Sequence, residues 1–157
     1  MTLIYKNQIL LYSFVFLLGL ISSYSLPPYN LFYLNFISYP AFLWILLKFP
    51  KYKVKSFNIG WMFGFGYFIS NLYWITNSLT FDENFKILIP FALILIPLFL
   101  SLFFSLMVLL VGPFLNFNIF SIFLFSGSLA FSDYLRSKIL TGFPWNLWAY
   151  SFSWSTE

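Results

Sequence analysis

The sequence contains neither cysteine nor histidine, and both absences remove whole classes of chemistry. Without cysteine the chain has no thiol nucleophile and no disulfide, and without histidine it has no imidazole base. The same absences remove the usual ligands of zinc, copper and haem. A glycine-rich phosphate loop and a nucleophile elbow are also missing from the sequence. We therefore expect no metal and no cofactor.

Charge is scarce as well, at 8% of residues, whereas 61% of residues are hydrophobic and 26% are aromatic. A soluble domain carries about 25% charged residues. Because so few polar groups are available to cover a surface in water, the apolar side chains must face lipid. The composition therefore predicts a membrane protein.

The net charge of +4 comes from eight basic and four acidic residues. Half of the basic residues lie in one stretch, KFPKYKVK, between two apolar segments. Nucleic-acid binding is one interpretation of a basic balance. Basic residues in short loops between apolar segments are more typical of a topology signal with some attraction to anionic headgroups. We expect no nucleic-acid partner.

Five apolar segments reach or approach the roughly 20 residues that a helix needs to cross the hydrocarbon core. They cover residues 9–26, 31–47, 59–79, 87–111 and about 119–135. The first has the charged head and apolar run of a signal peptide, but an uncleaved helix is favoured because four more segments follow. The sequence thus predicts an all-α membrane protein with about five transmembrane helices, forming a single membrane-embedded domain over 1–157.

The distribution of basic residues predicts the orientation, because cytoplasmic loops are enriched in lysine and arginine. A cytoplasmic N-terminus places Lys6 and the four lysines of KFPKYKVK inside. It leaves Lys86, Arg136 and Lys138 outside, a bias of five to three that agrees with the rule. The segment TGFPWNLWAY, residues 141–150, then lies on the outer (periplasmic) face.

Prolines and glycines mark the turns and one packing site. Pro27 and Pro28 predict a tight turn after the first helix, since proline cannot continue a helix. Gly60 and Gly64 form a GxxxG spacing, which lets two helix backbones approach closely but does not indicate the partner. The fourth segment would be about 37 Å long as a helix against a core of about 30 Å, so a tilt or a kink at Pro97 is expected.

Two groups of charged residues are candidates for chemistry. Asp82 and Glu83 are adjacent, but neighbouring acids on a loop usually point apart, so a solvated loop is expected there and not a catalytic pair. Asp133 and Arg136 are three residues apart and can share one helix face, where opposite charges attract. A structural pair is favoured, and the alternative is a role in holding a lipid headgroup or the next loop.

Several aromatic residues fall near the expected outer ends of the helices: Tyr73, Trp74, Trp145, Trp148 and Tyr150. Tryptophan and tyrosine concentrate where lipid meets water, so an aromatic belt explains them without a specific function. A belt does not explain the sequence Gly142-Phe143-Pro144. Glycine permits unusual backbone geometry and proline fixes its own φ, which together predict a shaped loop presenting Phe143 and Trp145 at the interface.

The segment TGFPWN, preceded by DYLRSKIL and followed by Tyr150, closely resembles part of the apolipoprotein N-acyltransferase family. In that family an outer loop after the fifth helix reads much like E-W-L-R-G, a short apolar link, TGFPW and Gly-Tyr. GFGYFISNLYWITNSL is similar to the family's third helix, and SLPPYN to its proline-containing turn. The resemblance covers essentially all 157 residues in order, and TGFPWN with its upstream arginine is the most specific part.

The resemblance implies a membrane enzyme that moves an acyl chain from phospholipid to the free α-amino group of a lipoprotein's diacylglyceryl-cysteine. The family does this through a thioester on a cysteine, assisted by a glutamate and a lysine, in a carbon–nitrogen-hydrolase-like domain outside the membrane. The helices anchor that domain and help to admit lipid substrates. The implied location is the bacterial cytoplasmic (inner) membrane, and the implied partners are membrane phospholipid and a diacylglyceryl lipoprotein.

The sequence departs from the family pattern after this loop and at positions near it. It reaches Glu157 about where the sixth helix is expected, so the resemblance includes no catalytic domain and no catalytic residue is carried over. Without cysteine, no covalent acyl intermediate can form on this sequence. Smaller departures are Asp133 for glutamate, Tyr134 for tryptophan, Ser137 for glycine and Ala149 for glycine.

We therefore expect the membrane anchor and lipid-access portion of an apolipoprotein N-acyltransferase, not catalytic as this chain alone. It would be a fragment, a gene relic, or half of a split enzyme with a separately encoded hydrolase domain. A freestanding lipid-binding or scaffold protein is the alternative, and a transporter is disfavoured because the spans hold almost no ionisable residues. The residues expected at the junction with lipid or with the catalytic domain are Tyr73, Trp74, Arg136, Gly142, Phe143, Pro144, Trp145, Asn146 and Tyr150.

Overall fold

The computed structural model describes residues 8–48, 53–139 and 146–156 of the 157-residue chain. Its α-helices are α2 (Gln8–Ser23), α3 (Asn35–Lys48), α4 (Lys53–Asn71), α5 (Ile89–Val111) and α6 (Ile119–Lys138). The 3₁₀ segments are η1 (Phe32–Leu34), η2 (Tyr73–Thr80), η3 (Glu83–Leu88), η4 (Gly112–Phe114) and η5 (Trp148–Thr156). These described ranges contain no strand, which confirms the all-α fold class.

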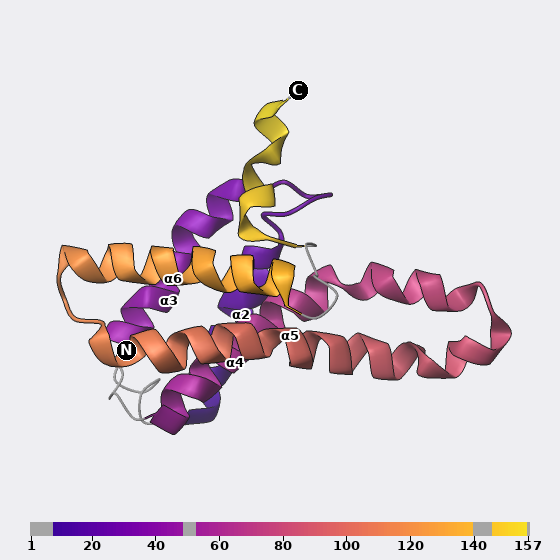
Figure 1. Ribbon diagram of the computed structural model, residues 1–157, viewed down its shortest axis with the longest axis horizontal. Helices are drawn as coiled ribbons and strands as arrows, with labels where there is room; N and C mark the ends of the chain where they lie inside the picture. The colour runs from indigo at the N-terminus through magenta and orange to yellow at the C-terminus, as the bar shows by residue number, and fades with distance from the viewer. Residues whose placement is uncertain (1–7, 49–52, 140–145, 157) are drawn as a thin grey trace.

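The centre of the fold is α4, which packs against α2 on one side and α5 on another. Figure 1 shows α5 and α6 running side by side, with one end of α5 continuing beyond the other helices. There α5 pairs with η2 and η3 to form a projecting hairpin, which we call the arm (residues 73–96). At the top of the view in Figure 1, η5 rises from the body and leads towards the C-terminus.

The third helix differs from its expected range of 59–79. It starts earlier, at Lys53, and ends at Asn71, after which the chain continues as 3₁₀ helix. In this continuation the hydroxyls of Thr76, Ser78 and Thr80 each donate to the carbonyl three residues back, at 2.6 to 2.7 Å. Such local bonds compete with the α-helical ladder and accompany the tighter 3₁₀ winding. Apolar composition alone therefore overestimated how far the α-helix runs.

Among the described residues, one helical stretch is both long enough and apolar enough to cross a membrane. It covers Glu83–Phe114, 32 residues with a mean hydropathy of 2.8, and includes η3, α5 and η4. Gln8–Ser23 and Phe32–Lys48 are apolar helices of shorter length. A helix of 32 residues is at least about 48 Å long, so it exceeds the hydrocarbon core even more than the sequence suggested.

Two sets of glycines allow α4 to approach its neighbours closely. At the crossing of α2 and α4, a methyl group on Gly19 would lie 2.0 Å from the Phe63 carbonyl oxygen, and one on Gly66 would lie 2.1 Å from that of Phe16. Gly60 and Gly64 of the GxxxG spacing face α5 instead, where a methyl group would meet backbone atoms within 3 Å. The structure thus identifies α5 as the partner that the sequence left open.

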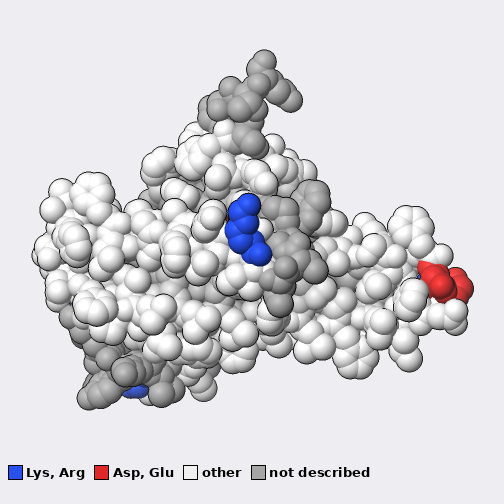
Figure 2. Space-filling model, viewed as in Figure 1, with Lys and Arg blue, Asp and Glu red and all other residues white. Residues whose placement is uncertain are grey.

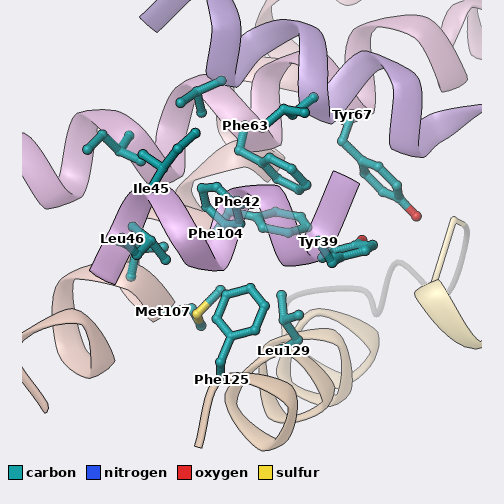
Figure 3. Packing of buried hydrophobic residues seen from close by; sticks show 14 of the residues in the cluster. Tyr39, Phe42, Ile45, Leu46, Phe63, Tyr67, Phe104, Met107, Phe125 and Leu129 are labelled. Atoms are coloured by element: carbon teal, nitrogen blue, oxygen red, sulfur yellow. The ribbon is translucent and has the colours of Figure 1, made fainter. Parts of the chain in front are cut away.

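A cluster of stacked aromatic rings fills the space between the helices (Figure 3). Phe42 of α3 and Phe63 of α4 are stacked with ring centroids 4.1 Å apart, and Phe63 lies 5.4 Å from Phe104 of α5. Phe125 of α6 meets Phe42 edge-on at 5.9 Å. Offset and edge-to-face pairs of this kind add about 0.5–1.5 kcal/mol each beyond the area they bury. Four helices therefore share one aromatic core.

Candidate functional site

The last turn of α6 carries an arginine that is almost completely buried. Arg136 is only 2% exposed, and its guanidinium Cζ lies 5.0 Å from the centroid of the Phe68 ring of α4. Its Nη2 donates to Asp133 Oδ1 at 3.0 Å and to the carbonyl oxygen of Asn146 at 3.0 Å. Burying a cation is costly unless it is paired and hydrogen-bonded, and here both conditions are met.

Asp133 connects the arginine to the segment that follows α6. While Oδ1 accepts from Arg136, Oδ2 accepts from the backbone N–H of Trp148 at 2.8 Å. The side chain of Asp133 is 20% exposed and that of Arg136 only 1%, so solvent reaches the aspartate but hardly the arginine. Charge-assisted bonds are roughly twice as strong as neutral ones. The pair therefore fixes both α6 and the start of η5.

Asn146 is the point at which this segment is held. Its φ of 56° lies in the left-handed region, which asparagine tolerates better than most residues. Its carbonyl oxygen accepts from Arg136 and from the hydroxyl of Tyr67 in α4, the latter at 3.1 Å. One carbonyl thus joins α4, α6 and the C-terminal segment. In Figure 3, Tyr67 and Tyr39 turn their hydroxyl ends towards the same side.

Trp148 is half-buried and packs against aromatic side chains of α3 and η5. Its ring lies edge-on to Tyr39 of α3 at 5.7 Å and to Phe152 of η5 at 5.7 Å. Phe152 in turn lies 6.2 Å from Phe32 at the start of η1. The beginning of η5 therefore rests on the N-terminal end of α3, opposite the contact that Asp133 makes with its backbone.

A second polar group ties together the same ends of α2, α3 and α4. Ser22 donates to Asn35 Oδ1 at 2.9 Å, and Asn71 Nδ2 donates to the Ser23 carbonyl at 3.1 Å. Ser23 and Ser70 also share a hydrogen bond between their hydroxyls. Polar side chains that bond across helices hold apolar helices in register, a role typical of helix contacts in membranes.

Within the described part of the chain, the buried donors Asn35 Nδ2, Asn146 Nδ2 and Trp148 Nε1 have no hydrogen-bond partner. Two of them belong to the segment held by Arg136. Unsatisfied buried donors are rare in folded proteins and usually mark a place for water or another acceptor. The site therefore presents several hydrogen-bond donors, which an oxygen acceptor would satisfy.

The described residues contain no group of acidic side chains able to hold a metal ion. Glu83 pairs with Lys86 at the exposed tip of the arm, and the side chain of Asp82 caps η3 by accepting from Asn84 N at 2.9 Å. These acids have structural partners and do not converge as an acid–base pair. What the geometry offers is a shaped, anchored segment and not a set of reacting groups.

The structure brings together only part of the predicted junction. Arg136 and Asn146 are bonded to each other, whereas Tyr73, Trp74 and Tyr150 are 53%, 38% and 43% exposed. The predictions for Gly142, Phe143, Pro144 and Trp145 fall outside the described residues. Sequence reasoning missed Tyr67 and the inward packing of Trp148. A tyrosine within an apolar span was the available signal for the former.

The sequence pattern described as "Apolipoprotein N-acyltransferase N-terminal domain" matches residues 18–157, which include α3 to α6 and the arginine site. The chain belongs to this family. The apolipoprotein N-acyltransferase of Brucella melitensis is 32% identical over 145 residues, 87% of this chain and 27% of the relative. That of Rhodopseudomonas palustris is 35% identical over 146 residues, 87% of this chain and 26% of the relative.

The matched region of the N-acyltransferase family is thus confined to part of each relative. The apolipoprotein N-acyltransferase of Rhizobium etli is 33% identical over 141 residues, 84% of this chain and again only 26% of the relative. The chain therefore spans about a quarter of the length of these curated relatives. The family resemblance inferred from TGFPWN is confirmed, and the fold described above belongs to the family's N-terminal domain.

Proposed function

We propose that this chain is the membrane-embedded anchor and lipid-access portion of an apolipoprotein N-acyltransferase of the bacterial inner membrane. The five helices α2 to α6 cross the bilayer as one domain, with a cytoplasmic N-terminus and an outer C-terminal segment. The observation that carries the proposal is the buried Arg136 site, which lies inside the family match and fixes the segment after α6. A catalytic domain docked there would meet a rigid surface.

The distribution of apolar side chains supports insertion into lipid. Large apolar residues are exposed on α3, α5 and α6, including Phe36, Ile37, Phe91, Ile94, Leu95, Leu110, Phe120, Phe123 and Phe131. An apolar surface of this extent is not stable in water. Figure 2 shows a face almost without charge, apart from a basic patch near the centre, a small basic area at the lower left and the acidic tip of the arm.

The two ends of the bundle differ in charge, which supports the proposed orientation. Lys48 at the end of α3 lies 5.0 Å from the ring of Phe117, which follows α5, so the lysine-rich stretch and the α5–α6 connection share one end. Asp82 and Glu83 lie on the arm between α4 and α5. The basic end is cytoplasmic under the positive-inside rule.

Single-cysteine labelling tests this topology directly, because the sequence has no cysteine to remove. Tyr29→Cys and Asn84→Cys are expected to react with a membrane-impermeant maleimide in intact spheroplasts. Phe117→Cys should react only after lysis. All three positions are exposed in the structure, so burial would not explain a difference. Labelling of Phe117→Cys alone before lysis would reverse the proposed orientation.

The role in acyl transfer is tested by reconstitution. Membranes with this chain alone are expected to show no transfer from labelled phospholipid to a diacylglyceryl lipopeptide, because the chain has no nucleophilic cysteine. Co-expression with the remaining part of a full-length relative should restore it. Trp145→Ala should lower that activity at least tenfold with insertion unchanged, and Phe117→Ala at the opposite end should have little effect (about tenfold per 1.4 kcal/mol of transition-state contact).

Failure to restore acyl transfer in the reconstituted pair would count against the anchor role. If the two parts do not associate while this chain inserts and folds stably alone, the freestanding lipid-binding or scaffold role replaces the anchor role. Unchanged activity in Trp145→Ala would contradict the proposed part of residues 141–145 in lipid or domain contact.

A further inference from the structure

An apolar groove of about 210 Å³ lies between α5 and α6. Its α5 wall includes Phe103, Leu106 and Leu110, and its α6 wall includes Ser128, Ser132 and Ile139. Almost no polar surface lines it. The small serines leave space on the α6 side that larger residues would fill. The groove is separate from the arginine site, since Arg136 is not among its lining residues.

The length of the groove matches a single lipid chain. From Ser128 to Ile139 the α6 wall is about 16 Å long at 1.5 Å per residue. That length is about half of a hydrocarbon core of about 30 Å, which is the depth of one leaflet.

A positive charge at one end of the groove favours an anionic headgroup. On α6, Ser128, Phe131 and Leu135 line the groove, and Lys138 follows Leu135 at the same helical spacing, beyond the lining residues. Lys138 is exposed in the last turn, while Arg136 in the same turn is buried. In Figure 2 the basic patch near the centre of the view lies over this end of α6. An ammonium group at the membrane boundary attracts a phosphate, and the effect per lysine is about fivefold in binding.

We propose that this groove binds one acyl chain of an anionic phospholipid of the outer leaflet, with Lys138 at its phosphate. The inference rests on the proposed membrane orientation, because only then does Lys138 lie at the outer boundary. The site holds a resident lipid and takes no part in acyl transfer.

The experiment is lipid competition on the purified full chain. The protein is incubated in detergent with equal amounts of phosphatidylglycerol and phosphatidylcholine of identical chains, and bound lipid is counted by native mass spectrometry. We expect about a fivefold preference for phosphatidylglycerol. Lys138→Gln should abolish the preference, whereas Lys86→Gln on the arm should keep it.

A matched pair of variants tests the groove itself. Ser128→Phe fills the groove and should remove the bound lipid of either headgroup. Ser126→Phe, two residues away at an exposed position outside the groove, should not. Equal binding in both variants, or no headgroup preference in the unmodified chain, would overturn the proposal. So would a disulfide between two copies formed by Phe131→Cys and lost in Ser128→Phe, since it would assign the groove to a second copy.

The cysteine-labelling result separates the two proposals. If labelling supports the topology and lipid selectivity is absent, only the groove assignment fails. If labelling shows no insertion, the membrane role fails first.

Discussion

Replacement of Arg136 by methionine is expected to detach the segment around Asn146 and Trp148 and to lower the free energy of unfolding by about 3 kcal/mol or more. The arginine is the donor that joins Asp133 to the Asn146 carbonyl, and its side chain is only 1% exposed. Its loss leaves a largely buried carboxylate with one partner, the N–H of Trp148. An uncompensated buried charge costs more than the missing bond itself.

The measurement is unfolding in mixed micelles by increasing SDS, followed by circular dichroism, with limited proteolysis of the C-terminal segment as the local readout. Lys138→Met is the matched control, because it removes a cation from the same helical turn at an exposed position. That control should change stability by less than about 0.5 kcal/mol. Equal losses in both variants would mean that the buried network contributes nothing beyond general charge.

The double variant Asp133→Asn, Arg136→Met separates the pair from its surroundings. An amide can still accept from the N–H of Trp148, so removing both charges should cost less than removing the arginine alone. If the double variant is less stable than Arg136→Met by a further full increment, the two residues act independently and the ion pair is not the unit that holds the segment.

The contacts of Arg136 were predictable from the sequence only in part. The spacing of Asp133 and Arg136 indicated a shared helix face, because that contact depends only on helical periodicity. The bonds from Arg136 to Asn146 and from Asn146 to Tyr67 depend on how three separate segments meet. Nothing in local composition encodes such a meeting, so they required the structure.

The bounds of the helices were likewise predictable only in part. Hydrophobic runs gave α5 within two residues of its observed bounds, since 87–111 was expected and Ile89–Val111 is observed. The α-helix expected over 59–79 ends early, at Asn71. Hydroxyl-to-carbonyl bonds of Thr76, Ser78 and Thr80 accompany the 3₁₀ winding that follows, and hydropathy does not predict this winding. The GxxxG spacing at Gly60 and Gly64 indicated a close crossing, but its partner α5 followed only from the fold.

Gly66→Ala is the second substitution expected to have a large effect, about 3 kcal/mol of lost stability. The added methyl group would lie 2.1 Å from the carbonyl oxygen of Phe16 in α2, a backbone atom that no rotamer change can move away. The two helices must separate, and the packing around their crossing is lost with the contact. Unfolding in SDS and thermal aggregation of the detergent-solubilised chain are the measurements.

Gly127→Ala distinguishes close packing from a general intolerance of alanine for glycine. Gly127 lies within α6, and a methyl group there meets nothing within 4 Å. Alanine favours the helix over glycine by about 1 kcal/mol, so this variant should be neutral or slightly more stable. Opposite signs for the two variants would assign the stability of the bundle to the α2–α4 crossing. A gain in both would mean that helix propensity, and not the approach of the two backbones, decides the outcome, and a loss in both would mean a general intolerance of alanine at these glycines.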